Sequence, residues 1–450
     1  MKYKWSYYNI IEIINKDVII YNTKTSAIIK INKDIYDYIN SFFNESTNNL
    51  ENDNNFKLLV QQGIIIDDSL NEKEFVKNKY LTNFYDKQKL NITILPIESC
   101  NLTCPYCFIY NYSKTIISDT LSDDIFKFIK NKVDARDKSK KFLLKINWYG
   151  GEPLLKKSFI LSFMEKINEY ISYENKNNTE KNSIKVVGTI ITNGVFLNSK
   201  LFVDLCKVNI RSFQITFDGG KEFHDKTRCD INGNGSFDII INNLKEIVNV
   251  NEKFLVSLRI NFMKNSLNSV KPLIDTLKSI IKQDERFTIY CRPVYNFKTA
   301  RDDINKVKND ILDIDEGLRK EFESANYIQD KNFNKLHQAL PIARNCWCVE
   351  DNDYSYIVGA NGVVYKCDTL IGDKKFSIGK FVNGNYIPNE TNKKWTLNIF
   401  QLNEFSKCYD CNLLPICFGG CKRNVFEHGK SCFITENQIR ESLIECLKRR

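Results

Sequence analysis

From residue 90 onward, short continuous apolar runs alternate with segments whose apolar residues recur every three or four positions. The first pattern is typical of strands buried on both faces, and the second of amphipathic helices that pack on them. Six such units predict an α/β fold with a parallel sheet. They are too few to close an eight-fold barrel, so we expect a partial (β/α)6 TIM-like barrel. The runs lie at 90–98, 142–153, 184–194, 211–220, 254–262 and 287–294.

Helical patterns follow these runs, and two serines are expected to cap helices. Ser122 precedes an apolar stripe that begins at Ile125, and Ser236 precedes one that begins at Ile240. The remaining helices are predicted around Phe163, around Leu205 and over 269–281.

The first 88 residues form a separate pattern. A helix is expected from Asp34, a second helix ends near Gly63, and a strand follows at 63–67. Together with a three-stranded meander, these elements predict a winged-helix-like module. Exposed strand edges can accept an added peptide strand, so the module is either a peptide-recognition element or a structural lid. The meander strands are expected at 8–14, 17–22 and 26–32.

Composition narrows the function classes. The net charge of +10 is spread along the chain without a dense Lys/Arg tract, which argues against nucleic-acid binding. No apolar run is long enough for a membrane span, and no export signal opens the chain. A cytoplasmic protein is therefore expected. In a reducing compartment, fifteen cysteines indicate metal ligands before disulfides.

Three cysteines follow the first apolar run closely. Cys100, Cys104 and Cys107 have a C-x3-C-x2-C spacing. Thiolates are soft ligands that suit iron–sulfur clusters and zinc. Three of them in one short loop can hold three corners of a four-iron cluster and leave the fourth iron open to a small molecule.

Other polar and glycine-rich motifs fall at the carboxyl ends of the predicted strands, where barrel enzymes build their sites. Their convergence near the three-cysteine loop exceeds what turns alone require. They are Gly150-Gly151-Glu152-Pro153, Thr192-Asn193-Gly194, Asp218-Gly219-Gly220, Arg259 and Asn261.

Eight further cysteines lie in the last hundred or so residues. They are enough to ligate two four-iron clusters, and the alternative is a pair of zinc sites. A predicted hairpin with an Asn361-Gly362 turn leads to the third of them. Cys206, Cys229, Cys291 and Cys446 are isolated and are expected to be core residues. The eight are Cys346, Cys348, Cys367, Cys408, Cys411, Cys417, Cys421 and Cys432.

Together, C-x3-C-x2-C, GGEP, the FDGG…HDKTR segment and the C-terminal cysteine series resemble radical S-adenosylmethionine (SAM) enzymes with a C-terminal SPASM domain. The resemblance covers residues 90 to 450. It implies a [4Fe-4S] cluster on Cys100, Cys104 and Cys107 whose open iron chelates SAM. Reductive cleavage of SAM would give a 5′-deoxyadenosyl radical that abstracts hydrogen from a substrate. The expected parts are a recognition-like module at 1–88, the barrel at 89–298, a helical connector at 299–345 and the SPASM domain at 346–450.

The resemblance also implies SAM contacts. Gly150, Gly151 and Glu152 of the GGEP turn would meet the methionine amino group, and Tyr106 would lie along the adenine. Thr216 and Arg228 stand where the family has a SAM-binding Ser and Arg, and the Arg charge suits a carboxylate. Asn193, Arg259 and Asn261 are further candidates.

For the C-terminal cysteines the resemblance implies two auxiliary [4Fe-4S] clusters, three clusters in all. Cys346 or Cys348 or both, with Cys367 and Cys421, would hold the first. The close Cys346-Trp347-Cys348 spacing departs from the family pattern, so an open iron that could ligate a substrate thiolate is the alternative. The second would be held by Cys408, Cys411, Cys417 and Cys432.

The SPASM group modifies peptides or proteins, so the implied partners are a precursor peptide or protein and an electron donor such as flavodoxin or ferredoxin. The N-terminal module favours a maturase of ribosomally made peptides that forms a thioether or carbon–carbon crosslink. One alternative is an anaerobic sulfatase-maturating enzyme that makes formylglycine, because Asp368 stands where those enzymes carry a proposed general base. The other is an iron–sulfur electron-transfer or zinc-binding protein.

Overall fold

The computed structural model describes residues 2–45, 53–109, 115–176, 178–179, 182–296, 302–313, 316–317, 320, 324, 328, 340–348, 351–430, 432 and 434–448. The chain divides into two compact units. The barrel unit comprises Asp86–Asp330 and Tyr354–Thr396, and the terminal unit comprises Met1–Tyr85, Lys331–Asp353 and Leu397–Arg450. Each is described by itself.

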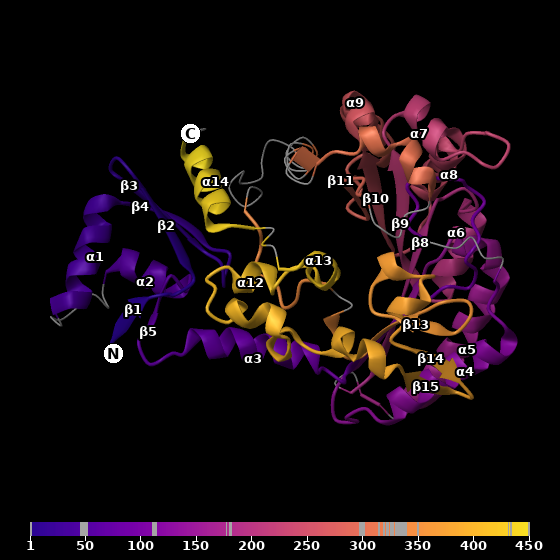
Figure 1. Ribbon diagram of the computed structural model, residues 1–450, viewed down its shortest axis with the longest axis horizontal. Coiled ribbons are helices and arrows are strands. Elements are labelled where there is room, and N and C mark those ends of the chain that lie inside the picture. The colour runs from indigo at the N-terminus through magenta and orange to yellow at the C-terminus, as the bar shows by residue number, and fades with distance from the viewer. Residues whose placement is uncertain are drawn as a thin grey trace. The chain divides into compact units, whose positions relative to one another are not determined.

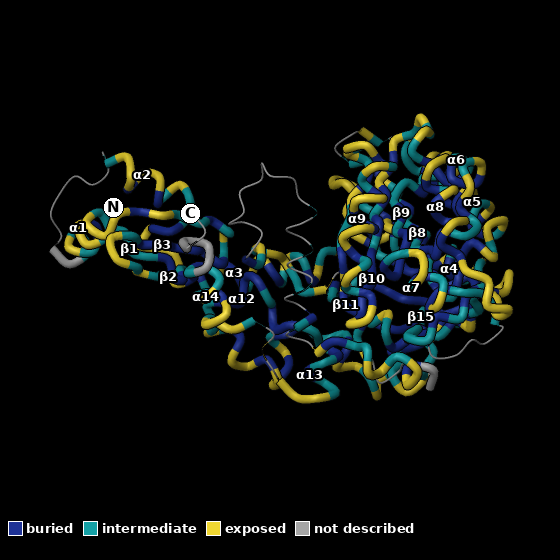
Figure 2. Tube along the Cα trace, turned by 90° about the horizontal axis from the view of Figure 1, so that it is seen from above, coloured by how far each residue is buried: buried dark blue, intermediate teal, exposed yellow. Residues whose placement is uncertain are grey.

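Six parallel strands form the centre of the barrel unit and neighbour one another in chain order (Figure 1). All six were predicted, and the partial (β/α)6 barrel is confirmed. Most of their apolar residues are buried, although Leu255 at the start of β10 is exposed. In Figure 2 the exposed stretches of this unit lie on its outside. The strands are β6 (Lys89–Ile94), β7 (Phe142–Trp148), β8 (Ile184–Thr192), β9 (Ile210–Asp218), β10 (Leu255–Phe262) and β11 (Phe287–Pro293).

The predicted helices are present, but one predicted cap is wrong and another residue has a different role. Ser118, and not Ser122, caps the first helix, because its side chain accepts from the Leu121 N–H. Ser236 precedes α8 without a side-chain cap and hydrogen-bonds elsewhere. The predicted helices are α4 (Asp119–Asp134), α5 (Lys157–Asn175), α6 (Ser199–Lys207), α8 (Phe237–Ile247) and α9 (Leu267–Ile281), and a further helix, α7 (Lys221–Thr227), was not predicted.

A second group of strands extends the sheet beyond β6. β12 (Ser355–Val358) pairs parallel with β6, and β13 (Val363–Tyr365) returns antiparallel, which confirms the predicted hairpin. Gly362 turns this hairpin with a φ of 79°, a region that glycine occupies without steric cost. β14 (Gly379–Val382) and β15 (Asn385–Pro388) complete the sheet. Cys367 lies two residues after the end of β13 and therefore belongs to the barrel unit.

The terminal unit begins with the predicted meander of β2 (Asn9–Ile14), β3 (Asp17–Asn22) and β4 (Ile28–Asn32). Helices α1 (Lys33–Glu45) and α2 (Asn54–Gln61) follow as expected. A short strand β1 (Tyr3–Trp5), which was not predicted, pairs antiparallel with β5 (Ile65–Asp67).

The C-terminal helix α14 (Glu436–Lys448) packs on this meander. Ile439 and Leu443 share a buried apolar cluster with Ile10 and Tyr21. Arg440 donates to the backbone oxygen of Ile11 at 2.8 Å. The two ends of the chain are therefore parts of one core.

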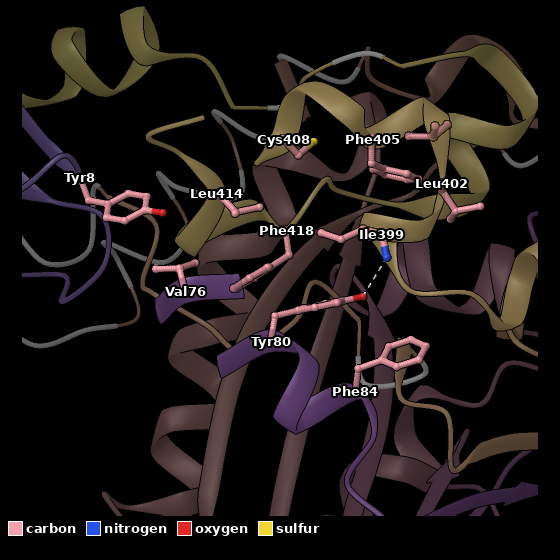
Figure 3. Close-up of a cluster of buried hydrophobic side chains, with 11 residues drawn as sticks. Tyr8, Val76, Tyr80, Phe84, Ile399, Leu402, Phe405, Cys408, Leu414 and Phe418 are labelled. Carbon is pink, nitrogen blue, oxygen red and sulfur yellow. Dashed lines mark hydrogen bonds between the residues drawn. The ribbon is translucent and has the colours of Figure 1, made fainter. Parts of the chain in front are cut away.

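A third helix, α3 (Glu72–Phe84), was not predicted and joins the N-terminal module to the cysteine-rich segment. The Tyr80 ring stacks on Phe418, with ring centroids 5.2 Å apart and planes 21° apart (Figure 3). The Tyr80 hydroxyl donates to Asp351 at 2.8 Å. Phe405 and Cys408 belong to the same buried cluster, so α3 forms part of the core beneath the cysteine loop.

Residues 346–450, predicted as one SPASM domain, are shared between the two units. The stretch 354–396 belongs to the barrel unit, and most of the predicted helical connector at 299–345 falls outside the described residues. Among the described helices, none has the length and apolar content needed to span a membrane.

The α3 contact leads to a stability prediction. Tyr80→Ala should lower the free energy of unfolding of the terminal unit by about 3–5 kcal/mol, since it leaves a cavity beneath Phe418. Native-state hydrogen exchange at the amides of α3 and of residues 399–418 measures this change. Phe75→Ala, on the same helix but 52% exposed, is the control and should change it by less than about 0.5 kcal/mol. Equal effects of the two variants would contradict the assigned packing.

Candidate active site

The three-cysteine loop lies directly after β6, at the carboxyl end of the parallel strands. Cys104 is buried, and Cys100 and Cys107 are partly buried. The Cys100 sulfur accepts from the Leu102 N–H at 3.4 Å. The Thr103 N–H donates to the Cys229 oxygen at 2.9 Å, which anchors the loop to the segment that follows α7.

The Gly150-Gly151 turn holds the start of this loop by backbone contact. A Cβ atom at Gly151 would lie 2.1 Å from the Ser99 oxygen, and one at Gly150 would lie 2.4 Å from the Ile97 oxygen. In this space the Glu152 N–H donates to the Ser99 oxygen at 3.0 Å. Both glycines are therefore required for the approach of β7 to the cysteine loop.

Glu152 is fully buried and joins the ends of β7 and β8. Its carboxylate accepts from the Leu154 N–H at 2.9 Å, the Thr192 hydroxyl at 2.8 Å and the Asn193 N–H at 2.8 Å. Burial raises the pKa of Glu152, and these three hydrogen bonds oppose that rise. The carboxylate thus sets the backbone position of Asn193.

Asn193 in turn reaches the cysteine loop. Its Nδ2 donates to Asn101 Oδ1 at 2.8 Å and lies 3.8 Å from the Cys100 sulfur. A predicted site residue therefore contacts a predicted cluster ligand directly.

A second network surrounds Tyr106. Its hydroxyl donates to Asp218 at 2.5 Å and accepts from Arg228 Nη1 at 3.0 Å. Asn261 donates to the second oxygen of Asp218 at 3.1 Å, and Thr227 donates to the first at 2.8 Å. Asp218 is only 1% exposed, so its charge is held almost entirely by these donors and by the nearby guanidinium.

Arg228 retains one donor that points into the protein. Its Nε is buried and has no hydrogen-bond partner among the described residues. An unsatisfied buried donor is costly, and an anionic ligand group would satisfy it. The arrangement fits the predicted carboxylate contact.

The register of the sheet brings the remaining candidates to the same end. Thr216 on β9 pairs with Arg259 on β10, and Asp218 pairs with Asn261. Arg259 Nε donates to Asn261 Oδ1 at 2.8 Å, which links this pair to the Tyr106 network.

His224 supports the network from behind. Its Nδ1 accepts from the Asp218 N–H at 3.2 Å, and its Nε2 lies 3.0 Å from the Ser236 hydroxyl. Ser236 donates to the Arg228 backbone oxygen at 2.6 Å, which explains why it does not cap α8. Burial lowers the pKa of His224 to about 3, so the ring stays neutral.

Asp218, His224 and Thr227 were not predicted as site residues, although the segments that contain them were noted. Asp218 is on β9, and its partner Asn261 is on β10. Only the strand register makes them neighbours. The signal was the position of Asp218 at a strand end.

Asp368 and Cys367 follow β13 in the barrel unit. The Cys367 sulfur lies 3.0 Å from the Thr369 hydroxyl, and Asp368 is exposed. Burial raises the pKa of Tyr149 well above its ordinary value, and the charges of Asp368 and Cys107 raise it further. The charge of Asp368 thus acts on Tyr149, the residue that precedes the GGEP turn.

The donor set of the first loop suits an iron–sulfur cluster. Burial, followed by the charge of Glu152, raises the pKa of Cys100 to about 12, and burial also raises the pKa of Cys104. Such thiols become thiolates only beside a strong cation, which cluster irons supply. Within the described residues, no three His, Cys, Asp or Glu side chains converge on a point that suits a single ion. In a cubane each thiolate binds a different iron, so that convergence is not needed.

The terminal unit holds the four cysteines assigned to the second auxiliary cluster. Burial raises the pKa values of Cys408, Cys411 and Cys417, and the positive charge of Lys430 lowers all three. No disulfide joins any of the cysteines that the structure describes, so none competes for these ligands there.

The ligands suggested for the first auxiliary cluster are distributed differently. Cys346, Cys348 and Cys421 belong to the terminal unit, and Cys367 belongs to the barrel unit. The assignment of this cluster stays a prediction.

Comparison with known proteins agrees with this site. Residues 94–277 match the model of the Radical SAM superfamily. The Cysteine-type anaerobic sulfatase-maturating enzyme of Clostridium novyi (strain NT) is 27% identical over 363 residues, which cover 75% of this chain and 89% of that protein.

Two solved structures have a similar fold. That of anSMEcpe with bound AdoMet and Cp18Cys peptide has a TM-score of 0.50 and 21% identity, and the match covers 80% of this chain and 96% of that chain. That of Streptococcus suis SuiB bound to S-adenosylmethionine has a TM-score of 0.50 and 15% identity, and the match covers 94% of this chain and 97% of that chain.

The close backbone approach at Gly151 predicts the effect of one methyl group. Gly151→Ala should displace the cysteine loop and lose about four irons per chain relative to the wild type, measured after anaerobic reconstitution. Gly233→Ala is the control for steric contact: its φ of 81° strains an alanine locally, but its Cβ meets nothing within 4 Å, so this variant should keep its irons. Full iron content in Gly151→Ala would contradict the role of the turn.

Neutral His224 predicts a pH dependence. The unfolded chain takes up a proton below about pH 6.5, whereas the folded ring does so only near pH 3, so stability falls as pH drops between these values. Urea denaturation at pH 8 and pH 5 should therefore show a loss about 2 kcal/mol larger in the wild type than in His224→Gln. Exposed His428→Gln should behave as the wild type. An unchanged pH dependence in His224→Gln would exclude a buried neutral ring.

Proposed function

We propose that the chain is a radical SAM enzyme, because residues 94–277 match the Radical SAM superfamily, and that it is a maturase of a ribosomally made precursor peptide. The proposed product is a thioether or carbon–carbon crosslink. The observation that carries the proposal is the cysteine loop, which is held by Gly151 beside Asn193 and the Arg228 network.

In this proposal Cys100, Cys104 and Cys107 hold a [4Fe-4S] cluster, and SAM binds beside it. When bound, the two supply one-electron cleavage of SAM and a 5′-deoxyadenosyl radical that abstracts hydrogen. Arg228 would bind the carboxylate of SAM, because its buried Nε donor has no hydrogen-bond partner among the described residues. Tyr106, Thr216, Arg259 and Asn261 line the same strand ends and are assigned to the rest of the cofactor.

The structure suggests a division of roles among the GGEP residues. The Glu152 carboxylate accepts three hydrogen bonds, from Leu154, Thr192 and Asn193. We therefore assign Glu152 as a positioning residue, and we assign contact with the amino group of SAM to the turn around Gly150 and Gly151.

The N-terminal module is proposed to bind the precursor peptide. Within the described residues, β4 has a strand partner only in β3, so its outer edge can accept an added strand. Arg440 of α14 donates to the backbone of β2 at the other edge. The match to SuiB covers 94% of this chain. The uncovered 6% is a smaller part of the chain than the N-terminal module, so the match must include residues of that module. This supports a module of similar fold in the two chains.

Two auxiliary [4Fe-4S] clusters complete the proposal. The second is assigned to Cys408, Cys411, Cys417 and Cys432, and the first to Cys346 or Cys348 or both, with Cys367 and Cys421. A low-potential donor such as flavodoxin or ferredoxin would supply the electron. The radical SAM domain favours this enzyme over a zinc-binding or simple electron-transfer protein.

A second candidate is formylglycine formation in a sulfatase. The 27% identity to the Clostridium novyi enzyme favours it, as does the electrostatic reach of Asp368 toward Tyr149. In that reaction Asp368 would be the general base, and Asp368→Asn would slow product formation.

One experiment separates these functions. The reconstituted full-length enzyme, given SAM, dithionite and a synthetic Cys-containing candidate precursor peptide, should release 5′-deoxyadenosine and a peptide lighter by two hydrogens. A product that reacts with an aldehyde-specific hydrazide would instead identify formylglycine. Cys104→Ala should abolish 5′-deoxyadenosine release, and buried Cys206→Ala, located on α6, should retain it. Release by Cys104→Ala would refute the assigned cluster.

A further inference from the structure

Lys430 lies between helix α13 (Lys422–His428) and Cys432. Its side chain is turned toward the cysteine loop. The ammonium donates to the Gly419 oxygen at 2.5 Å and lies 4.9 Å from the centroid of the Phe405 ring. Phe405 is buried, so the ammonium is held against the inside of the loop although the residue as a whole is exposed.

The acceptor for this ammonium is produced by an unusual turn. Phe418, Gly419 and Gly420 all have positive φ, at 40°, 81° and 78°. A Cβ atom at Gly419 would lie 2.4 Å from the Phe405 ring, so only glycine fits there. The turn separates Cys417 from Cys421 and directs the Gly419 carbonyl at Lys430.

The same ammonium acts on three of the four cysteines assigned to the second auxiliary cluster. Gly419 lies two residues after Cys417, and Phe405 lies three residues before Cys408, so these two contacts fix the ammonium beside the cysteine loop. In keeping with that position, the positive charge of Lys430 lowers the pKa values of Cys408, Cys411 and Cys417. Cys432 is two residues further along the chain. Lys407 is adjacent to Cys408 in sequence, yet it is exposed and is not among the charges that act most strongly on that thiol.

We propose that Lys430 is a positioning residue that raises the reduction potential of the cluster held by Cys408, Cys411, Cys417 and Cys432. This inference rests on the proposed function. Reduction of a [4Fe-4S]²⁺ cluster takes one electron from the donor and adds one negative charge without forming or breaking a bond. A cation held at a fixed position beside the cluster stabilises the more negative form, and nearby charge is one of the factors that set the potentials of such clusters.

The test is an EPR-monitored redox titration of the reconstituted full-length chain, following the signals that SAM leaves unchanged. Lys430→Met should make one midpoint more negative, by about a tenfold change in the reduction equilibrium, or ~59 mV for one electron. Lys430→Arg, which keeps the charge and a donor, should restore the wild-type midpoint. Lys407→Met removes the same charge from a neighbouring position and should leave the midpoint in place.

Each other outcome overturns the inference. An unchanged midpoint in Lys430→Met at full iron content excludes tuning, and an equal shift in Lys407→Met assigns the effect to net charge. Loss of about four irons in Lys430→Met means that the side chain only holds the loop together. A wild-type chain with no more than about four irons would overturn the auxiliary clusters of the proposed function as well, whereas the first three outcomes leave that function standing.

Discussion

The site depends on one contact between two backbones, in which the Gly150-Gly151 turn lies against residues 97–99. With a Cβ atom at 2.1 Å from the Ser99 oxygen, no other residue fits at Gly151 without moving the loop. Cys100 follows Ser99 directly in the chain. The contact at the end of β7 therefore also fixes the position of the Cys100 backbone. A small residue is thus required for geometry before any cofactor is considered, which explains why a glycine pair accompanies a metal-binding loop.

Around this contact two carboxylates are buried away from water, and each accepts hydrogen bonds from several donors. Glu152 is surrounded by three donors, and Asp218 by Tyr106, Thr227 and Asn261. Buried charges of this kind add little net stability, but they hold their partners in defined positions. Arg228 Nε is a fully buried donor of this network that has no hydrogen-bond partner among the described residues, so it is a candidate to bind a ligand.

The strands of the barrel are predictable from the sequence because a short continuous apolar run between turn residues is typical of a strand buried on both faces. The cysteine loop and the strand-end candidates are predictable because their motifs are local. The Asp218 network is not, since the pairing of β9 with β10 and the position of His224 arise only in the folded sheet. Helix α3 was missed although Val76, Tyr80 and Phe84 recur every four residues, because exposed Phe75 adds an apolar residue outside that face and makes the stripe less distinct.

The helix that was not predicted, α3, connects the N-terminal module to the segment that carries the proposed cluster ligands. Tyr80 stacks on Phe418, next to Cys417, and Cys408 lies in the same buried cluster. Ile439 and Leu443 pack on the meander from the opposite end of the sequence. The proposed peptide-binding module and the proposed cluster loop therefore share cores and cannot be separated by cutting the chain near residue 88. A truncation there removes α3, exposes Phe418 and disturbs the cysteine loop, so a loss of activity in such a variant carries no information about recognition. The outer edge of β4 beyond Ile28 is the better place to alter binding, because within the described residues it has no strand partner and it is not part of the α3 cluster.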